Sequence, residues 1–249
     1  MIWYILKRLI AAVPTLIAVL TVVFLIVRVI PGDPAMTVLG DQATPAALEA
    51  LRAKLGTDRP LYVQYWEFLW AALQGDLGRS LVSGRPIVAE VAAVLPHTID
   101  LTLASLIVGA AIGIPLGIWA ALHRNHFIDY AARIGSLIGL SFPVFVSGIF
   151  LLLAFALHWR WFPVIGSANL ADPGDRLWKL VLPTANLGLI MAAYITRVTR
   201  SAMLQVLSED YVRTARAKGL RERIVVWRHA LVNAMLPILT VSGLSLIHI

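Results

Sequence analysis

Five long stretches of this 249-residue chain contain no Asp, Glu, Lys or Arg, and this feature restricts the possible folds most strongly. The stretches are 9–27, 101–123, 134–157, 180–196 and 229–249. A helix needs about 20 apolar residues to cross the hydrocarbon core of a bilayer, because each residue advances it by about 1.5 Å. The pattern predicts an all-α, polytopic membrane protein with five transmembrane helices. It argues against a soluble protein with buried core helices, which are usually shorter than these stretches.

Lys7 and Arg8 precede the first stretch, as basic residues do in a secretory signal peptide. The apolar core that follows is longer than such a peptide needs, and the sequence RVIPGDPA does not resemble a small-x-small cleavage site. We therefore expect an uncleaved membrane anchor. The chain contains no cysteine, so the redox state of its compartment stays open.

The distribution of charge predicts which segments face the cytoplasm. With a cytoplasmic N-terminus, segments 1–8, 124–133 and 197–228 are inside, and they hold twelve Lys and Arg against four Asp and Glu. Segments 28–100 and 158–179 are then outside, with nine basic and ten acidic residues. Cytoplasmic loops of membrane proteins carry an excess of Lys and Arg. The net charge of +7 thus indicates membrane topology, and nucleic-acid binding is the less favoured interpretation.

The long segment after the first stretch is predicted to contain two short helices. In TPAALEALRAKLG, Thr44 can cap a helix, Pro45 suits its first turn and Gly56 can end it. The second helix lies in PLYVQYWEFLWAALQGDLG. Its aromatic side suits the membrane surface or a partner protein, and packing within the loop is an equally favoured alternative.

The second stretch carries a small residue at every fourth position. Residues four apart share one face of a helix, and small faces allow close helix packing in lipid. We therefore expect this helix to be central in a bundle, packing through Ser105, Gly109, Gly113, Gly117 and Ala121.

Each of the five stretches also contains a proline, which is expected to kink its helix and which slightly favours a transporter over a simple anchor. These prolines are Pro14, Pro115, Pro143, Pro183 and Pro237.

No catalytic, metal-binding or cofactor-binding constellation is present in the sequence. There is neither an HExxH motif nor a GxSxG nucleophile elbow, and none of the four lysines follows a glycine as a phosphate-binding P-loop requires. His123 and His126 could suggest a metal, although an interfacial loop explains them better. The chain is not expected to be an enzyme or to hydrolyse ATP itself.

The segment 209–223, with sequence EDYVRTARAKGLRER, is densely charged between apolar neighbours. Ser208 can cap a helix of about ten residues whose first turn is acidic, and Gly219 can supply its left-handed end. The 32 residues of 197–228 are many for a simple connection. We therefore expect a short helix that a cytoplasmic partner grips.

Several motifs resemble binding-protein-dependent ABC importer permeases, and more narrowly their dipeptide/oligopeptide/nickel branch. The main one is MLQVLSEDYVRTARAKGLRERIVVWRHALVNAMLPILT, which resembles the cytoplasmic EAA loop of that family. The others are PGDPA, LGTDRPLYVQYWEFLWAALQGDLGRSL, LPHTIDLTLAS and LPTANLGL. The glutamate that names the loop falls at Arg213, a departure that is usual in this branch.

This resemblance implies that the charged segment is a coupling helix that inserts into a groove of a cytoplasmic ATPase subunit. The coupling residues it implies are Glu209, Asp210, Tyr211, Arg213, Ala215, Lys218, Gly219 and Arg221. It also implies a second permease subunit, identical or related, two ATPase subunits that bind ATP and magnesium, and an extracytoplasmic substrate-binding protein. Membrane lipid is a further expected partner.

The resemblance implies the type I permease fold, with six transmembrane helices in the plasma (inner) membrane of a bacterium or archaeon. The chain ends in SLIHI within the fifth apolar stretch, so we expect a C-terminal truncation. The expected division is an N-terminal anchor (1–30), an extracytoplasmic loop (31–98) and a permease core (99–249) with its coupling loop at 201–228.

The expected function is ATP-driven import of di- or oligopeptides by alternating access. Nickel, glutathione or another small solute of the same branch is the alternative, and a membrane scaffold that recruits a cytoplasmic partner is an alternative of another class. The sequence does not identify the residues that bind the substrate, since in such importers the external binding protein largely selects the solute.

Overall fold

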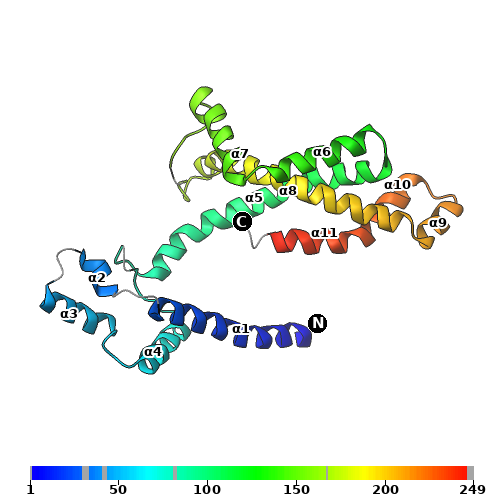
Figure 1. Cartoon of the computed structure of the whole chain (residues 1–249). Coiled ribbons are helices and arrows are strands. Elements are labelled where there is room, and N and C mark those ends of the chain that lie inside the picture. The colour runs from blue at the N-terminus through cyan, green and yellow to red at the C-terminus, as the bar shows by residue number, and fades with distance from the viewer. Residues whose placement is uncertain (1, 30–33, 41–43, 81–82, 167, 246–249) are drawn as a thin grey trace. The chain divides into compact units, whose positions relative to one another are not determined.

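The computed structural model describes residues 2–29, 34–40, 44–80, 83–166 and 168–245 as a series of helices (Figure 1). The chain divides into two compact units, residues 1–94 and 95–249. The helices are α1 (Ile2–Val29), α2 (Pro34–Leu39), α3 (Pro45–Leu55), α4 (Leu61–Leu73), α5 (Ile87–Leu122), α6 (Phe127–Ser141), α7 (Val144–Leu151), the π-helix η2 (Leu152–His158), α8 (Pro173–Leu207), α9 (Asp210–Ala217), α10 (Glu222–Ile224), the π-helix η3 (Val225–Ala230) and α11 (Leu231–Ser245).

Four described helical segments are long and apolar enough to cross a membrane: Ile2–Arg28, Ile87–Leu122, Pro173–Leu207 and Glu222–Leu244. A fifth span results if α6 and the α7–η2 segment are counted together. The prediction of an all-α, polytopic membrane protein is therefore confirmed.

The third apolar stretch is not the single helix that we expected from the sequence. Its two halves, Phe127–Ser141 and Val144–His158, are bent by 95° relative to each other. Phe142 is extended, with φ −82° and ψ 129°, and Pro143 starts the next helix. A proline ring disfavours helical geometry in the residue before it and cannot donate a backbone hydrogen bond, so the helix ends here. The other four prolines lie within helices that continue through them.

In the first unit, α1 packs on α4 through aromatic side chains. The Phe24 ring lies 5.3 Å from the Tyr65 ring and 5.7 Å from the Phe68 ring, measured between centroids. The hydroxyl groups of Thr21 and Tyr65 also share a hydrogen bond. The opposite side of α4 is exposed, including Tyr62 and Trp66. The aromatic side predicted from the sequence therefore does not pack within the described part of the loop.

Both ends of α3 agree with the sequence prediction. The Thr44 hydroxyl accepts a hydrogen bond from the backbone N–H of Ala47 at 3.3 Å. Gly56 has a φ of +66°, the left-handed conformation that glycine adopts without steric cost. The helix predicted in this segment is thus confirmed together with its caps.

In the second unit, α8 lies at the centre of the hydrophobic core. Its side chains pack with those of α5, η3 and α11 in one cluster of buried residues. Met203 and Ile195 of α8, Ile118 of α5 and Ile238 of α11 are almost completely buried there. Since α9 follows α8 after two residues, the core of this unit directly supports the charged segment.

Candidate functional site

The charged segment folds as the short helix α9, which begins one residue later than its sequence suggested. Glu209 is extended and precedes the first helical residue, Asp210. Ser208 does not cap α9, which corrects the sequence prediction, because its hydroxyl donates to the carbonyl oxygen of Gln205 in α8 at 2.7 Å. Gly219 follows the helix with a φ of +75°, as expected of a left-handed helix end. The helix has eight residues, against about ten expected.

One face of α9 is attached to the core of the second unit. Val212 and Ala215 are buried and pack against Val225 of η3, next to Val206 and Leu207 at the end of α8. Ala215 therefore lies on the buried face of α9, where a larger side chain would meet Val225, Val206 or Leu207. This apolar contact fixes α9 to the elements on both sides of it.

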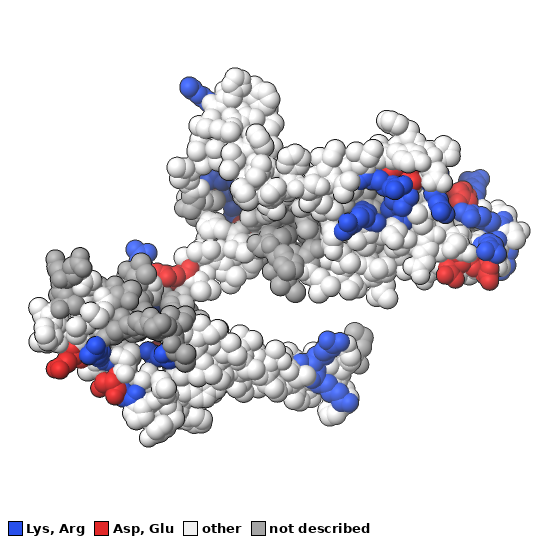
Figure 2. Space-filling model, viewed as in Figure 1, with Lys and Arg blue, Asp and Glu red and all other residues white. Residues whose placement is uncertain are grey.

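The other face of α9 and the turn after it are exposed and charged. Figure 2 shows Lys and Arg mixed with Asp and Glu at this end of the second unit. Tyr211 is 41% exposed. The exposed members of the predicted coupling set are Glu209, Asp210, Tyr211, Arg213, Lys218, Gly219 and Arg221.

An ion pair closes the turn between α9 and α10. The Arg216 guanidinium donates to both carboxylate oxygens of Glu222, at 3.1 and 2.7 Å. The Glu222 carboxylate raises the pKa of Arg216 above its ordinary value, chiefly through this hydrogen bond. Residues 218–221 thus form an exposed turn that this ion pair closes.

The small residues of α5 lie directly against the backbone of α8. A Cβ atom built on Gly113 would stand 2.8 Å from the carbonyl oxygen of Ala192, and one on Gly117 would stand 2.8 Å from that of Thr196. A Cβ on Gly109 would approach the Met191 Cβ to 2.6 Å. Glycine has only a hydrogen atom in place of a side chain, and this allows the two helices to pack so closely.

The close contact of Gly109, Gly113 and Gly117 with α8, which we name the glycine seam, continues at both ends. Ser105 at one end and Ala121 at the other are also buried. Gly188 of α8 meets α5 from the other side, since a Cβ there would lie 2.8 Å from Val108 Cγ1. The contact between α5 and α8 therefore extends over about four helical turns.

A buried ion pair joins the start of α6 to the second half of α8. Asp129 is fully buried and accepts hydrogen bonds from two nitrogens of Arg200, one of them at 2.7 Å. Its carboxylate also accepts the backbone N–H of Asn125 at 3.0 Å, and Asn125 has a left-handed φ of +63°. The sequence analysis missed this contact, because it treated Asp129 and Arg200 only as charges in cytoplasmic segments.

A second ion pair connects α5 to the first half of α8. Arg176 donates to both carboxylate oxygens of Asp100, one of them at 2.6 Å. On the same part of α8, Lys179 donates to Asp175 at 2.9 Å. Charged pairs therefore connect α8 to its neighbours on either side of the seam.

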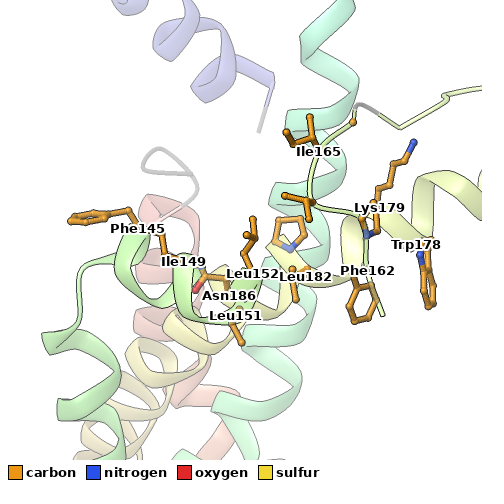
Figure 3. A pocket seen from close by; sticks show the side chains of 15 residues that line it. Phe145, Ile149, Leu151, Leu152, Phe162, Ile165, Trp178, Lys179, Leu182 and Asn186 are labelled. Carbon is orange, nitrogen blue, oxygen red and sulfur yellow. The ribbon is translucent and has the colours of Figure 1, made fainter. Parts of the chain in front are cut away.

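A cavity of about 420 Å³ opens between α7, η2 and the first half of α8, and we name it the α7–α8 cavity (Figure 3). Its wall is mainly apolar and aromatic, including Phe145, Phe162 and Trp178. Asn186 also lines it and accepts a hydrogen bond from the Ser147 hydroxyl at 2.7 Å. The Asn186 amide donates to the carbonyl oxygen of Val144 at 3.1 Å, so its polar atoms tie α8 to α7.

The histidines of the HRNH segment make local contacts. His123 Nδ1 lies 3.0 Å from the carbonyl oxygen of Trp119, and His126 Nδ1 lies 3.0 Å from that of Arg124. Within the described residues, no group of three His, Cys, Asp or Glu side chains is arranged to hold a metal ion.

Comparison with known proteins gives matches along nearly the whole chain. Residues 113–249 match the family described as "Binding-protein-dependent transport system inner membrane component". Residues 1–102 match the family described as "Binding-prot-dependent transport system membrane comp, N-term".

Curated relatives include the glutathione transport system permease protein GsiC of Shigella flexneri serotype 5b (strain 8401). It is 41% identical over 242 residues, which cover 97% of this chain and 77% of that protein. GsiC of Escherichia coli (strain K12) and of Salmonella typhimurium (strain LT2) match with the same identity and coverage.

Proposed function

Since this chain belongs to the family of binding-protein-dependent transport system inner membrane components, we propose that α9 couples a partner ATPase to the transport of glutathione or a similar short peptide. The chain is the permease subunit of an ABC importer and is not itself catalytic. It is a multi-pass protein of the bacterial inner-membrane type. Such an importer works with ATPase and substrate-binding partners.

The proposal for α9 is supported mainly by the way its two faces differ. Val212 and Ala215 attach the helix to η3 and to the end of α8, while charged side chains and Tyr211 remain exposed. A partner that grips the exposed face therefore acts on the packed core through a firm apolar contact. We propose that Glu209, Asp210, Tyr211, Arg213, Lys218 and Arg221 meet the ATPase, and that Ala215 and Gly219 preserve the shape of the element.

We propose that the cytoplasm contains the N-terminus and segments 124–133 and 197–228. The excess of Lys and Arg in these segments supports this orientation. The loop 31–98 then faces the substrate-binding protein, and 99–249 forms the permease core. A complete importer is proposed to contain a second permease subunit and two ATPase subunits.

Alternating access is proposed to operate through α8. This helix carries part of the α7–α8 cavity in its first half and leads directly to α9 at its other end. The glycine seam fixes its middle against α5. A displacement of α9 by the ATPase is therefore expected to move α8 and to change access to the cavity, as in other packed bundles with two stable arrangements.

The relatives support glutathione better than an unrestricted range of di- and oligopeptides, which was the first expectation from the sequence. Three named relatives are glutathione permeases and match 97% of this chain. Nickel and other small solutes stay alternatives. A decisive experiment measures uptake of radiolabelled glutathione, with a tripeptide and Ni²⁺ as competitors, by the importer assembled with its own binding protein.

The coupling assignment is tested at Gly219, where the left-handed backbone excludes most side chains. Gly219→Val places a β-branched residue in that conformation, whereas Gly219→Asn introduces a residue that tolerates it. We expect Gly219→Val to reduce both co-purification with the ATPase and ATP-driven uptake at least about tenfold, and Gly219→Asn to keep most of both.

Two results would contradict this assignment. If Gly219→Val left both measurements unchanged, α9 would not be the coupling element. If the wild-type complex retained the ATPase but showed no uptake of any tested solute, a scaffold that recruits a cytoplasmic partner would explain the chain better.

A further inference from the structure

A second cavity, of about 480 Å³, lies between α6 and the second half of α8, and we name it the α6–α8 cavity. It is separate from the α7–α8 cavity near the other end of α8 and from the exposed face of α9. Arginine residues line it from both helices: Arg133 from α6, and Arg197 and Arg200 from α8. Figure 2 shows Lys and Arg gathered over this part of the second unit.

The cavity carries more positive charge than its own residues neutralise. Arg200 pairs with Asp129. Arg133 and Arg197 belong to no ion pair among the residues that the structure describes, and each guanidinium lies over a tyrosine ring of its own helix, at 5.8 and 5.5 Å from the centroid. These contacts leave the N–H groups of both arginines available to an anion. The three arginines together with Asp129 carry a net charge of +2.

The charged part of the cavity borders directly on apolar surface. Ile134, Leu137 and Leu140 of α6 continue its wall. In the sequence, Arg133 directly precedes the uncharged stretch 134–157, and Arg197 directly follows the uncharged stretch 180–196. The arginines thus stand where hydrocarbon gives way to the polar region of a bilayer, next to a wall that suits acyl chains.

We propose that the α6–α8 cavity binds an anionic phospholipid, with its phosphate on Arg133 and Arg197 and its acyl chains along Leu137 and Leu140. Guanidinium groups bind phosphate oxygens in pairs of hydrogen bonds, and basic pockets between transmembrane helices select anionic headgroups. The hydroxyl groups of Ser136 and Ser201, which also line the cavity, supply further donors. An anionic lipid neutralises the two unpaired charges and covers the apolar wall at the same time, which a free anion does not do.

The test is a lipid titration of the purified full chain in detergent, followed by native mass spectrometry with phosphatidylglycerol as the probe. Arg133→Gln/Arg197→Gln removes the two proposed headgroup contacts and leaves the Asp129–Arg200 pair in place. Each basic residue near an anionic surface contributes about fivefold to affinity, so we expect binding to weaken about 25-fold. Arg223→Gln/Arg228→Gln removes two exposed charges elsewhere in the second unit and should change binding less than about threefold.

Three results would overturn the proposal. The first is an equal loss of binding in the two double variants, since the effect would then come from overall charge. The second is phosphatidylcholine binding as tightly as phosphatidylglycerol. The third is displacement of the lipid by millimolar inorganic phosphate, which would indicate a simple anion site. Circular dichroism of each variant identifies any loss of helical structure. A double variant that has lost helix is replaced by the single variants Arg133→Gln and Arg197→Gln, each of which should weaken binding about fivefold.

Discussion

At the scale of single residues, the glycines of α5 set how close α5 and α8 can come. Gly113→Ala adds a Cβ atom 2.8 Å from the Ala192 carbonyl oxygen, which belongs to the backbone and cannot rotate away. We expect this change to lower the free energy of unfolding by about 1–3 kcal/mol, the usual effect of overpacking a core. Unfolding in mixed detergent, followed by circular dichroism, measures the change.

Gly135→Ala is the matched control for this substitution. Gly135 is also a glycine within a helix, but no atom lies within 4 Å of the Cβ that the substitution adds. Alanine has the higher helix propensity, so stability should stay the same or rise by up to about 1 kcal/mol. Equal destabilisation by the two substitutions would mean that the seam is not tightly packed.

The Asp129–Arg200 pair should contribute strongly to stability because it is buried. Asp129→Asn leaves the Arg200 guanidinium without its charge partner, and we expect a loss of about 3 kcal/mol in the free energy of unfolding. Asp210→Asn removes the carboxylate of an exposed pair with Arg213 and should change stability by less than about 0.5 kcal/mol. The same unfolding assay compares the two variants, and similar losses would contradict a structural role for the buried pair.

Some of these residue contacts could be predicted from the sequence and others could not. The spacing of Gly109, Gly113 and Gly117 predicts a small face on one helix, because the period of a helix is fixed. The partner helix and the pairing of Asp129 with Arg200 depend on how helices far apart in the chain meet. No local pattern contains that information, although a single acid within a basic segment was a usable signal.

At the scale of elements, α9 should come loose when its buried face is made polar. Val212→Ser places a hydroxyl in the apolar contact with Val225, and we expect trypsin to cut at Arg213, Arg216 or Lys218 several times faster than in wild type. Tyr211→Ser changes the exposed face and should leave the cleavage rate unchanged while weakening co-purification with the ATPase. Rapid cleavage of both variants would show that the two faces have no separate roles.

Helix ends were predictable where a cap acts on its own helix. Thr44 and Gly56 define α3 through contacts within a few residues, and the sequence contains both signals. Ser208 failed as a cap because α8 continues through Leu207, which leaves the Ser208 hydroxyl closest to Gln205. The break at Pro143 was underestimated as a kink, since the backbone of Phe142 becomes extended.

At the scale of the whole molecule, the proposed topology can be tested cleanly because the chain has no cysteine. Single substitutions at exposed positions, Asp76→Cys and Thr214→Cys, introduce one labelling site each. A membrane-impermeant maleimide added to intact spheroplasts should label Asp76→Cys within minutes and should reach Thr214→Cys only after permeabilisation. The opposite pattern would reverse the orientation and remove α9 from the reach of a cytoplasmic ATPase.

The position of the glycine seam has a mechanical consequence for α8. A helix of 35 residues is about 52 Å long, and the residues that face the seam, from Gly188 to Thr199, lie near its middle. The seam can therefore serve as a fulcrum. The centre of this contact lies about 30 Å from the start of α8 and about 20 Å from its end, so a rotation of about 10° would move the two ends by about 5 and 3.5 Å in opposite directions. A pull of a few ångströms at α9 would then return as a displacement of similar size at the α7–α8 cavity.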